Sequence, residues 1–193
     1  MINFKLITMA KQLQAEDSNF EILYTGEDIQ KRVVELSDKI TADYSNDKGS
    51  PLLLLGVLKG ATPFLVDLSR SIQHPNLLMD YMGVTSYGLN DTSSREPRVT
   101  LDTKIPISDK NVIIVEDIVD TGYSIDTLLN ILRARKPKSL KVCAFLSKPD
   151  RREIDVPIDY LGFEIDNLWV QGYGLDTNER GRNWPYIAYK KKF

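Results

Sequence analysis

The amino-acid sequence predicts an α/β fold, an open parallel sheet flanked by helices. Short, almost wholly apolar runs at 52–58, 112–115 and 140–146 have the composition of strands buried on both faces of a parallel sheet. Amphipathic stretches with apolar residues at helical spacing separate these runs, as in repeated strand–helix units. With 193 residues, 42% of them hydrophobic, we expect a single domain over 1–193.

The first helix is predicted over 27–44. Thr25 and Asp28 form a capping-box pattern in front of it, and its apolar residues recur at helical spacing. A turn-rich stretch at 46–51 follows, and the first central strand is expected over 52–58.

A strand–helix–strand unit is predicted from this first central strand onward. Thr62 is expected to cap the helix, with Pro63 in its first turn, and a strand over 77–85 completes the unit. Two strands of one sheet joined through a helix run parallel.

The next segment, 86–109, is largely polar and is predicted to form a mobile hairpin or lid. Its β-like arms are expected over 79–87 and 98–105. Such segments often cover a binding site.

The C-terminal part of the chain changes to short strands, which we predict at 160–164, 168–170 and 186–189. Together with the N-terminal residues, the segment 149–193 is expected to form a small hood lobe over the core at 22–148. The hood would cover the carboxyl edge of the sheet, where open α/β sheets bind ligands.

The most informative stretch is 112–124, in which an apolar strand runs into a polar turn and then a helix reaching about residue 135. Glu116 and Asp117 stand where this strand is expected to end. Thr121 and Ser124 follow in a glycine-containing turn at the helix N-terminus, where free N–H groups and the helix dipole favour an anion. Two carboxylates beside an anion site need hydroxyl donors or a cation, which points to a sugar phosphate and Mg²⁺.

This stretch resembles the phosphoribosyl pyrophosphate signature of the type I phosphoribosyltransferases. The resemblance implies that Glu116 and Asp117 hold the ribose hydroxyls and, with Mg²⁺ as cofactor, act as metal ligands. It implies a 5′-phosphate loop made of Asp120, Thr121, Gly122, Tyr123 and Ser124. The alternative is a buried strand that runs into an acidic turn and a capped helix.

Further segments resemble one branch of this family, the hypoxanthine–guanine phosphoribosyltransferases. Leu58, Lys59 and Gly60 match its pyrophosphate loop, which carries a non-proline cis peptide between the first two. Ser86 and Tyr87 match the lid that closes over pyrophosphate. Arg182 matches a further pyrophosphate contact. Taken alone, these residues could also form an ordinary turn and a hairpin tip without a catalytic part.

The same resemblance places the purine base. Lys148 would contact the purine 6-oxygen, Trp169 would stack on the ring, and Val170 would bind the base through its backbone. Asp176 belongs to the same segment and would hold a Mg²⁺–pyrophosphate assembly. Asp120 would exchange a proton with purine N7 as the catalytic acid–base group. The alternatives are a surface lysine, a core tryptophan and a helix-capping aspartate.

The predicted function is Mg²⁺-dependent transfer of the phosphoribosyl group from phosphoribosyl pyrophosphate to hypoxanthine or guanine, in purine salvage. Xanthine stays open as a third substrate, because Trp169 stands where phenylalanine is common. A transferase of the same fold with xanthine or another base, a pyrimidine or adenine, as main substrate is an alternative, although Lys148 and the segment 169–176 argue against the last two. A regulator that senses phosphoribosyl pyrophosphate and binds nucleic acid is the alternative from another class. The net charge of −2 gives no electrostatic case for nucleic acid.

The remaining expectations concern surroundings and assembly. The N-terminal sequence is interrupted by charges and no apolar run approaches membrane-spanning length, so we expect a cytoplasmic protein without membrane contact. The single cysteine, Cys143, excludes an internal disulfide. The resemblance implies a homodimer or homotetramer.

Overall fold

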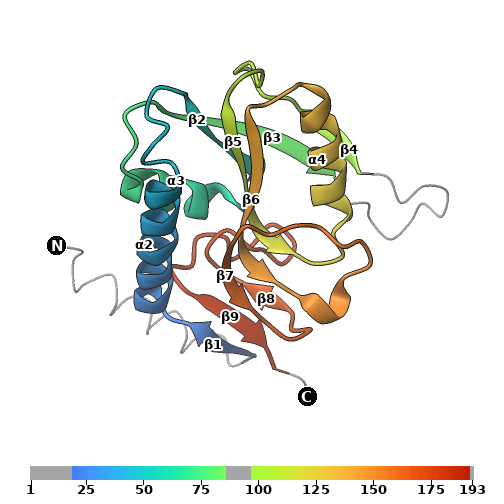
Figure 1. The fold of residues 1–193 in the computed structure, drawn as a ribbon. Helices are drawn as coiled ribbons and strands as arrows, with labels where there is room; N and C mark the ends of the chain where they lie inside the picture. Colours follow the sequence, from blue (N-terminus) through green and yellow to red (C-terminus); the bar gives the residue numbers. More distant parts are fainter. Residues whose placement is uncertain (1–18, 86–96, 192–193) are drawn as a thin grey trace.

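A six-stranded sheet forms the centre of the fold, and five of its strands run parallel (Figure 1). The computed structural model describes residues 19–85 and 97–191, and in that part of the chain the strand order is β4-β3-β2-β5-β6-β7. The bounds are β2 Leu52–Leu58, β3 Leu77–Thr85, β4 Arg98–Leu101, β5 Asn111–Val119, β6 Ser139–Ser147 and β7 Tyr160–Glu164. The predicted parallel α/β sheet is confirmed.

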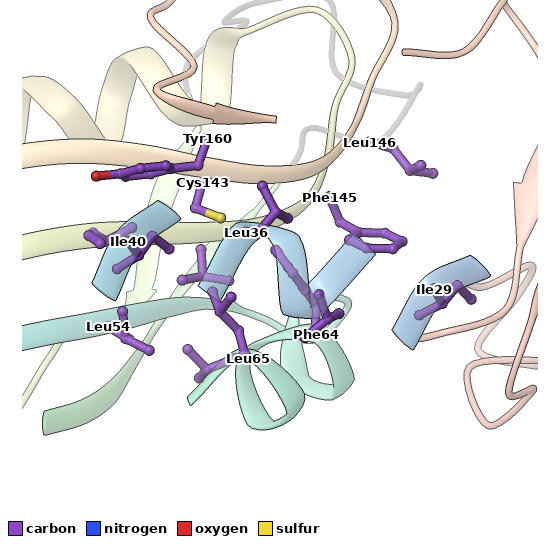
Figure 2. Packing of buried hydrophobic residues seen from close by; sticks show 14 of the residues in the cluster. Ile29, Leu36, Ile40, Leu54, Phe64, Leu65, Cys143, Phe145, Leu146 and Tyr160 are labelled. Atoms are coloured by element: carbon purple, nitrogen blue, oxygen red, sulfur yellow. The ribbon is translucent and has the colours of Figure 1, made fainter. Parts of the chain in front are cut away.

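Helices cover both faces of this sheet. Helices α2 (Gly26–Asp43) and α3 (Thr62–Ser71) lie on one face, and α4 (Tyr123–Ala134) lies on the other (Figure 1). Successive strand residues point to opposite faces, so Leu54 packs with α2 and α3 while Leu53 packs with α4. Figure 2 shows the first cluster, including Leu36, Ile40, Phe64, Cys143 and Phe145.

The two helix starts differ in how well the sequence predicted them. Thr25 is the N-cap of α2, and its capping box with Asp28 is complete, as predicted. The prediction that Thr62 caps α3 is wrong, because Ala61 is the N-cap and Thr62 is already helical. The Thr62 hydroxyl instead donates to the Lys59 carbonyl at 2.8 Å, so it ties the helix to the preceding loop.

Strand β5 extends beyond the acidic pair, which corrects the prediction that the strand ends there. Its pairing with β2 stops at Val115, whereas its pairing with β6 continues to Val119. Strand β2 itself continues to Leu58, but its last two residues pair with β3 alone. Glu116 and Asp117 therefore lie in a part of β5 that is supported only on the β6 side.

A second sheet of three strands is formed by β1 (Phe20–Tyr24), β9 (Ile187–Lys190) and β8 (Val170–Gln171), in the order β1-β9-β8. It unites the N-terminal and C-terminal parts of the described chain (Figure 1). Strand β7 was predicted to join this lobe, but it pairs with β6 in the main sheet. The cause is burial, since Tyr160 of β7 is 0% exposed in the main core.

The base of the predicted lid is an antiparallel pairing of β3 with β4. The tip, with Ser86 and Tyr87, lies outside the described residues. Beyond β4, the chain is held against the sheet, because the Asp80 carboxylate accepts hydrogen bonds from the Thr103 hydroxyl and the Lys104 and Ile105 N–H groups at 2.6–2.9 Å. Across 19–85 and 97–191, no helix is both long and apolar enough to span a membrane.

Candidate active site

A cleft of about 820 Å³ lies at the carboxyl ends of β2 and β5, the edge where open α/β sheets bind ligands. The segment after β8 closes it from the other side. Of the residues predicted from the sequence, it brings together Leu58, Lys59, Gly60, Glu116, Asp117, Asp120, Thr121, Gly122, Ser124, Asp176 and Arg182. These are most of the residues expected to meet ribose phosphate and pyrophosphate.

A second cleft of about 400 Å³ adjoins the first and contains the predicted base contacts Lys148 and Trp169. Asp120 and Arg151 line both clefts, so they stand at the boundary between them. Val170 is 7% exposed in β8 and lines neither cleft. Asp176 lies with the first cleft and not with Lys148 and Trp169.

The turn between β5 and α4 is clamped by the segment that follows β6. The Val119 carbonyl accepts from the Lys148 N–H at 3.0 Å, and the Thr121 carbonyl accepts from the N–H groups of residues 153 and 154, both at 3.0 Å. The Arg152 guanidinium donates to the Asp120 carbonyl at 3.1 Å. The carbonyls are engaged on this side, and Thr121, Gly122 and Ser124 at the start of α4 line the first cleft, where a helix N-terminus favours an anion.

Two glycines make close approaches possible here. Gly122, the N-cap of α4, has φ 97°, and a Cβ there would stand 2.3 Å from the Ile154 carbonyl oxygen. A Cβ on Gly60 would stand 1.7 Å from the Asp117 carboxylate. The predicted pyrophosphate loop and the acidic pair thus touch only because residue 60 lacks a side chain. The cis peptide expected between Leu58 and Lys59 is present.

Ionisation of the acidic pair is unfavourable in these surroundings. Burial first, and then the neighbouring Asp117, raise the pKa of Glu116 well above its usual range. Burial also raises the pKa of Asp117. The Oε2 atom of Glu116 is buried without a hydrogen-bond partner. A carboxylate in such surroundings needs a cation or hydroxyl donors once it is ionised.

The donor set fits Mg²⁺ held jointly with a substrate. Among the described residues, no three His, Cys, Asp or Glu side chains gather closely enough to hold a metal alone. Mg²⁺ commonly binds through one or two carboxylates together with substrate oxygens and water. Glu116 and Asp117 both line the first cleft and could supply such carboxylates, which can also accept from ribose hydroxyls.

Removing the buried charge should stabilise the free protein in a pH-dependent way. The pKa of Glu116 is raised in the folded protein, so protonated Glu116 contributes stability to the fold. This contribution is fully present below the unfolded-state pKa of about 4.3, and it is lost as the pH rises through the folded-state pKa. Glu116→Gln should therefore raise the free energy of unfolding by about 1–3 kcal/mol at alkaline pH. Thermal melts from pH 4 to 9 should show the gain vanish at pH 4.

The control for these melts is Glu35→Gln, which removes a carboxylate from an exposed pair with Arg32 on α2. It should give no such pH-dependent gain. Equal curves for Glu116→Gln and the parent across the range would contradict the burial argument.

At the boundary of the clefts, the Asp120 carboxylate faces two cations. It pairs with Arg151 Nε at 3.0 Å and with Lys148 Nζ at 3.6 Å. Lys148 is 8% exposed, so its ammonium is a largely desolvated hydrogen-bond donor in the lining of the second cleft. The Trp169 ring is 59% exposed and is oriented by a 2.8 Å hydrogen bond from its Nε1 to the Thr177 hydroxyl.

Sequence reasoning missed three residues of this site: Arg151, Arg152 and Glu179. The two arginines follow Lys148 and Pro149 in a basic run that reads as a solvated turn. Their adjacency to the end of an apolar strand is the one signal that could have drawn attention to them. Glu179 meets Lys59 only in the folded chain, so no local pattern could have found that contact.

Comparisons with known proteins agree with this geometry. Residues 21–178 match the phosphoribosyl transferase domain family. A hypoxanthine-guanine phosphoribosyltransferase of Bacillus subtilis is 41% identical over 171 residues, 89% of this chain and 93% of the relative. A hypoxanthine phosphoribosyltransferase of Haemophilus influenzae is 40% identical over 168 residues, 87% of this chain and 93% of the relative.

A crystal structure of a hypoxanthine phosphoribosyltransferase from Staphylococcus aureus is similar to this fold with a TM-score of 0.82 and 40% identity, covering 89% of this chain and 91% of that one. The fold is thus that of a phosphoribosyltransferase, an enzyme that transfers a phosphoribosyl group. Within this class, the chain belongs to the hypoxanthine–guanine phosphoribosyltransferase family.

Proposed function

We propose that the enzyme transfers the 5-phosphoribosyl group from phosphoribosyl pyrophosphate to hypoxanthine or guanine, giving IMP or GMP and pyrophosphate. The observation that carries this substrate choice is the buried Lys148 ammonium beside Asp120. An ammonium can only donate, so it pairs with the 6-oxygen of hypoxanthine or guanine and leaves the 6-amine of adenine without an acceptor.

The two clefts suggest which part of the substrates each residue would bind. The turn at 120–124 would bind the 5′-phosphate, and Glu116 and Asp117 would accept from the ribose hydroxyls. Trp169 would stack on the base, and Asp120 would hold the N7 proton, which makes N9 the better nucleophile. Lys59 and Arg182 would neutralise the departing pyrophosphate. When bound, Mg²⁺ would neutralise charge on the pyrophosphate oxygens.

Three further proposals concern the lid, the oligomeric state and the cellular location. Ser86 and Tyr87 are proposed to shield the reacting carbon from water as a lid. A homodimer or homotetramer is also a proposal, as is a cytoplasmic location. Among the solved structures similar to this fold, one from Trypanosoma cruzi concerns the role of the C-terminal region in the oligomeric state of that enzyme.

The test is to incubate hypoxanthine, guanine, xanthine or adenine with phosphoribosyl pyrophosphate and Mg²⁺ and to quantify the nucleotide formed. IMP and GMP should form readily, and AMP should form roughly 10⁴-fold less efficiently, as expected where a buried donor is left unpaired. Efficient AMP formation would refute the role of Lys148. A dominant XMP product would move the enzyme to xanthine as main substrate.

A further inference from the structure

Glu179 bridges the two cations that are proposed to bind pyrophosphate. Its Oε2 atom lies 3.2 Å from Lys59 Nζ and 3.2 Å from Arg182 Nη2. The same oxygen accepts from Arg182 Nε at 3.4 Å. Lys59 stands between β2 and α3, whereas Glu179 and Arg182 follow β8, so one carboxylate oxygen joins opposite walls of the cleft.

Arg182 does not depend on Glu179 for its position. Its Nη1 donates to the Gly174 carbonyl at 2.9 Å, and its Nη2 lies 2.8 Å from an Asp176 carboxylate oxygen. The Asp176 carboxylate is itself fixed by the Glu179 backbone N–H at 2.8 Å, a contact that any residue at 179 except proline can make. The Glu179 side chain is 64% exposed and can move away without disturbing these contacts.

The backbone at Glu179 favours a different residue. Thr177 and Arg180 exchange two backbone hydrogen bonds of 3.1 Å, and the residues between them, Asn178 and Glu179, have φ 52° and 63°. This is the geometry of a type I′ turn, which prefers asparagine followed by glycine. A glutamate therefore occupies a left-handed backbone conformation at some conformational cost. The side-chain hydrogen bonds described above for Glu179 are all with Lys59 and Arg182, the two cations proposed to bind pyrophosphate.

We propose that Glu179 is an internal competitor of pyrophosphate. Its carboxylate takes the place of a phosphoryl oxygen on Lys59 and Arg182, and pyrophosphate must displace it. Carboxylate and phosphate oxygens accept the same charge-assisted hydrogen bonds from lysine and arginine, so the exchange needs no other rearrangement. The competitor lowers the affinity for pyrophosphate and so favours its release. This inference rests on the proposed function, since it requires Lys59 and Arg182 to bind pyrophosphate.

The experiment is calorimetric titration of the full chain with pyrophosphate, once with EDTA and once with Mg²⁺. Glu179→Gln keeps the side-chain length without the charge, and Glu179→Gly also gives the turn its preferred residue. Both should bind pyrophosphate roughly 3- to 10-fold more tightly in either series, the range that two exposed ion pairs can supply. The melting temperature of Glu179→Gly should equal or exceed that of the parent.

Glu35→Gln is the matched control, because it changes the net charge equally and breaks an exposed arginine pair outside both clefts. Its pyrophosphate affinity should equal that of the parent. Unchanged or weaker binding by Glu179→Gln would overturn the inference, and weakening confined to the Mg²⁺ series would show Glu179 to be a metal ligand instead.

A separate arm tests the foundation of the inference. Lys59→Ala and Arg182→Ala should each weaken pyrophosphate binding relative to the parent. If neither does, the assignment of the pyrophosphate cations fails, and with it the inference. If both do while Glu179→Gln binds as the parent does, the proposed function stands and only the competitor role fails.

Discussion

Asp120→Asn is expected to lower the turnover number by about 10²–10⁴, the range in which general acid–base groups contribute. The substitution keeps the size of the side chain and an oxygen that can accept from Arg151 and Lys148, but it removes the proton acceptor. Because Asp120 lies where the two clefts meet, its loss should act on the bond-forming step. The affinity for phosphoribosyl pyrophosphate should change little.

Steady-state kinetics with hypoxanthine, together with calorimetry for phosphoribosyl pyrophosphate, would separate the two effects. Asp150→Asn serves as the control, since Asp150 is an exposed carboxylate of the neighbouring turn (Pro149–Arg151) and lines neither cleft. It should keep parental turnover. If Asp120→Asn also kept it, Asp120 would be no more than a loop residue that holds Arg151.

The double variant Glu116→Gln with Asp117→Asn is expected to weaken GMP binding by about 10- to 100-fold, since hydrogen bonds to charged groups are worth roughly 1.5–3 kcal/mol each and amides retain part of that. Binding of free sulfate should be unchanged, because the anion is proposed to bind the turn at 121–124 and not the carboxylates. The variant should also melt no lower than the parent at neutral pH, as it lacks the buried charge pair.

The sequence predicted best what local patterns determine. Apolar runs, the Thr25 capping box and the polar turn before α4 depend on neighbouring residues, and the structure places them as expected. Extension of β5 to Val119 could not be read locally, because it depends on β6 continuing to pair after the pairing of β5 with β2 has stopped at Val115. The same holds for β7, whose short apolar sequence fits either sheet until Tyr160 is seen to be buried in the main core beside β6.

The residues of the candidate site also fall into those that local sequence patterns predict and those that only folding brings together. Residues of the β5–α4 stretch were predictable because strand, acids and loop are contiguous. The clamp from Arg152 was not, since its three acceptors, the carbonyls of Val119 and Asp120 and the Ser147 hydroxyl, lie on two strands and a turn. The contact of Glu179 with Lys59 joins residues 120 positions apart, and only folding brings them together.

The central claim is that the acidic pair binds ribose while the following turn binds phosphate. The most direct test is to titrate sulfate and GMP by calorimetry into the parent, the double amide variant, and Thr121→Val with Ser124→Ala, which removes two hydroxyl donors from the turn. We expect the amide variant to lose affinity for GMP alone, whereas the hydroxyl variant should lose affinity for both anions. Parental binding of GMP by the amide variant would contradict it.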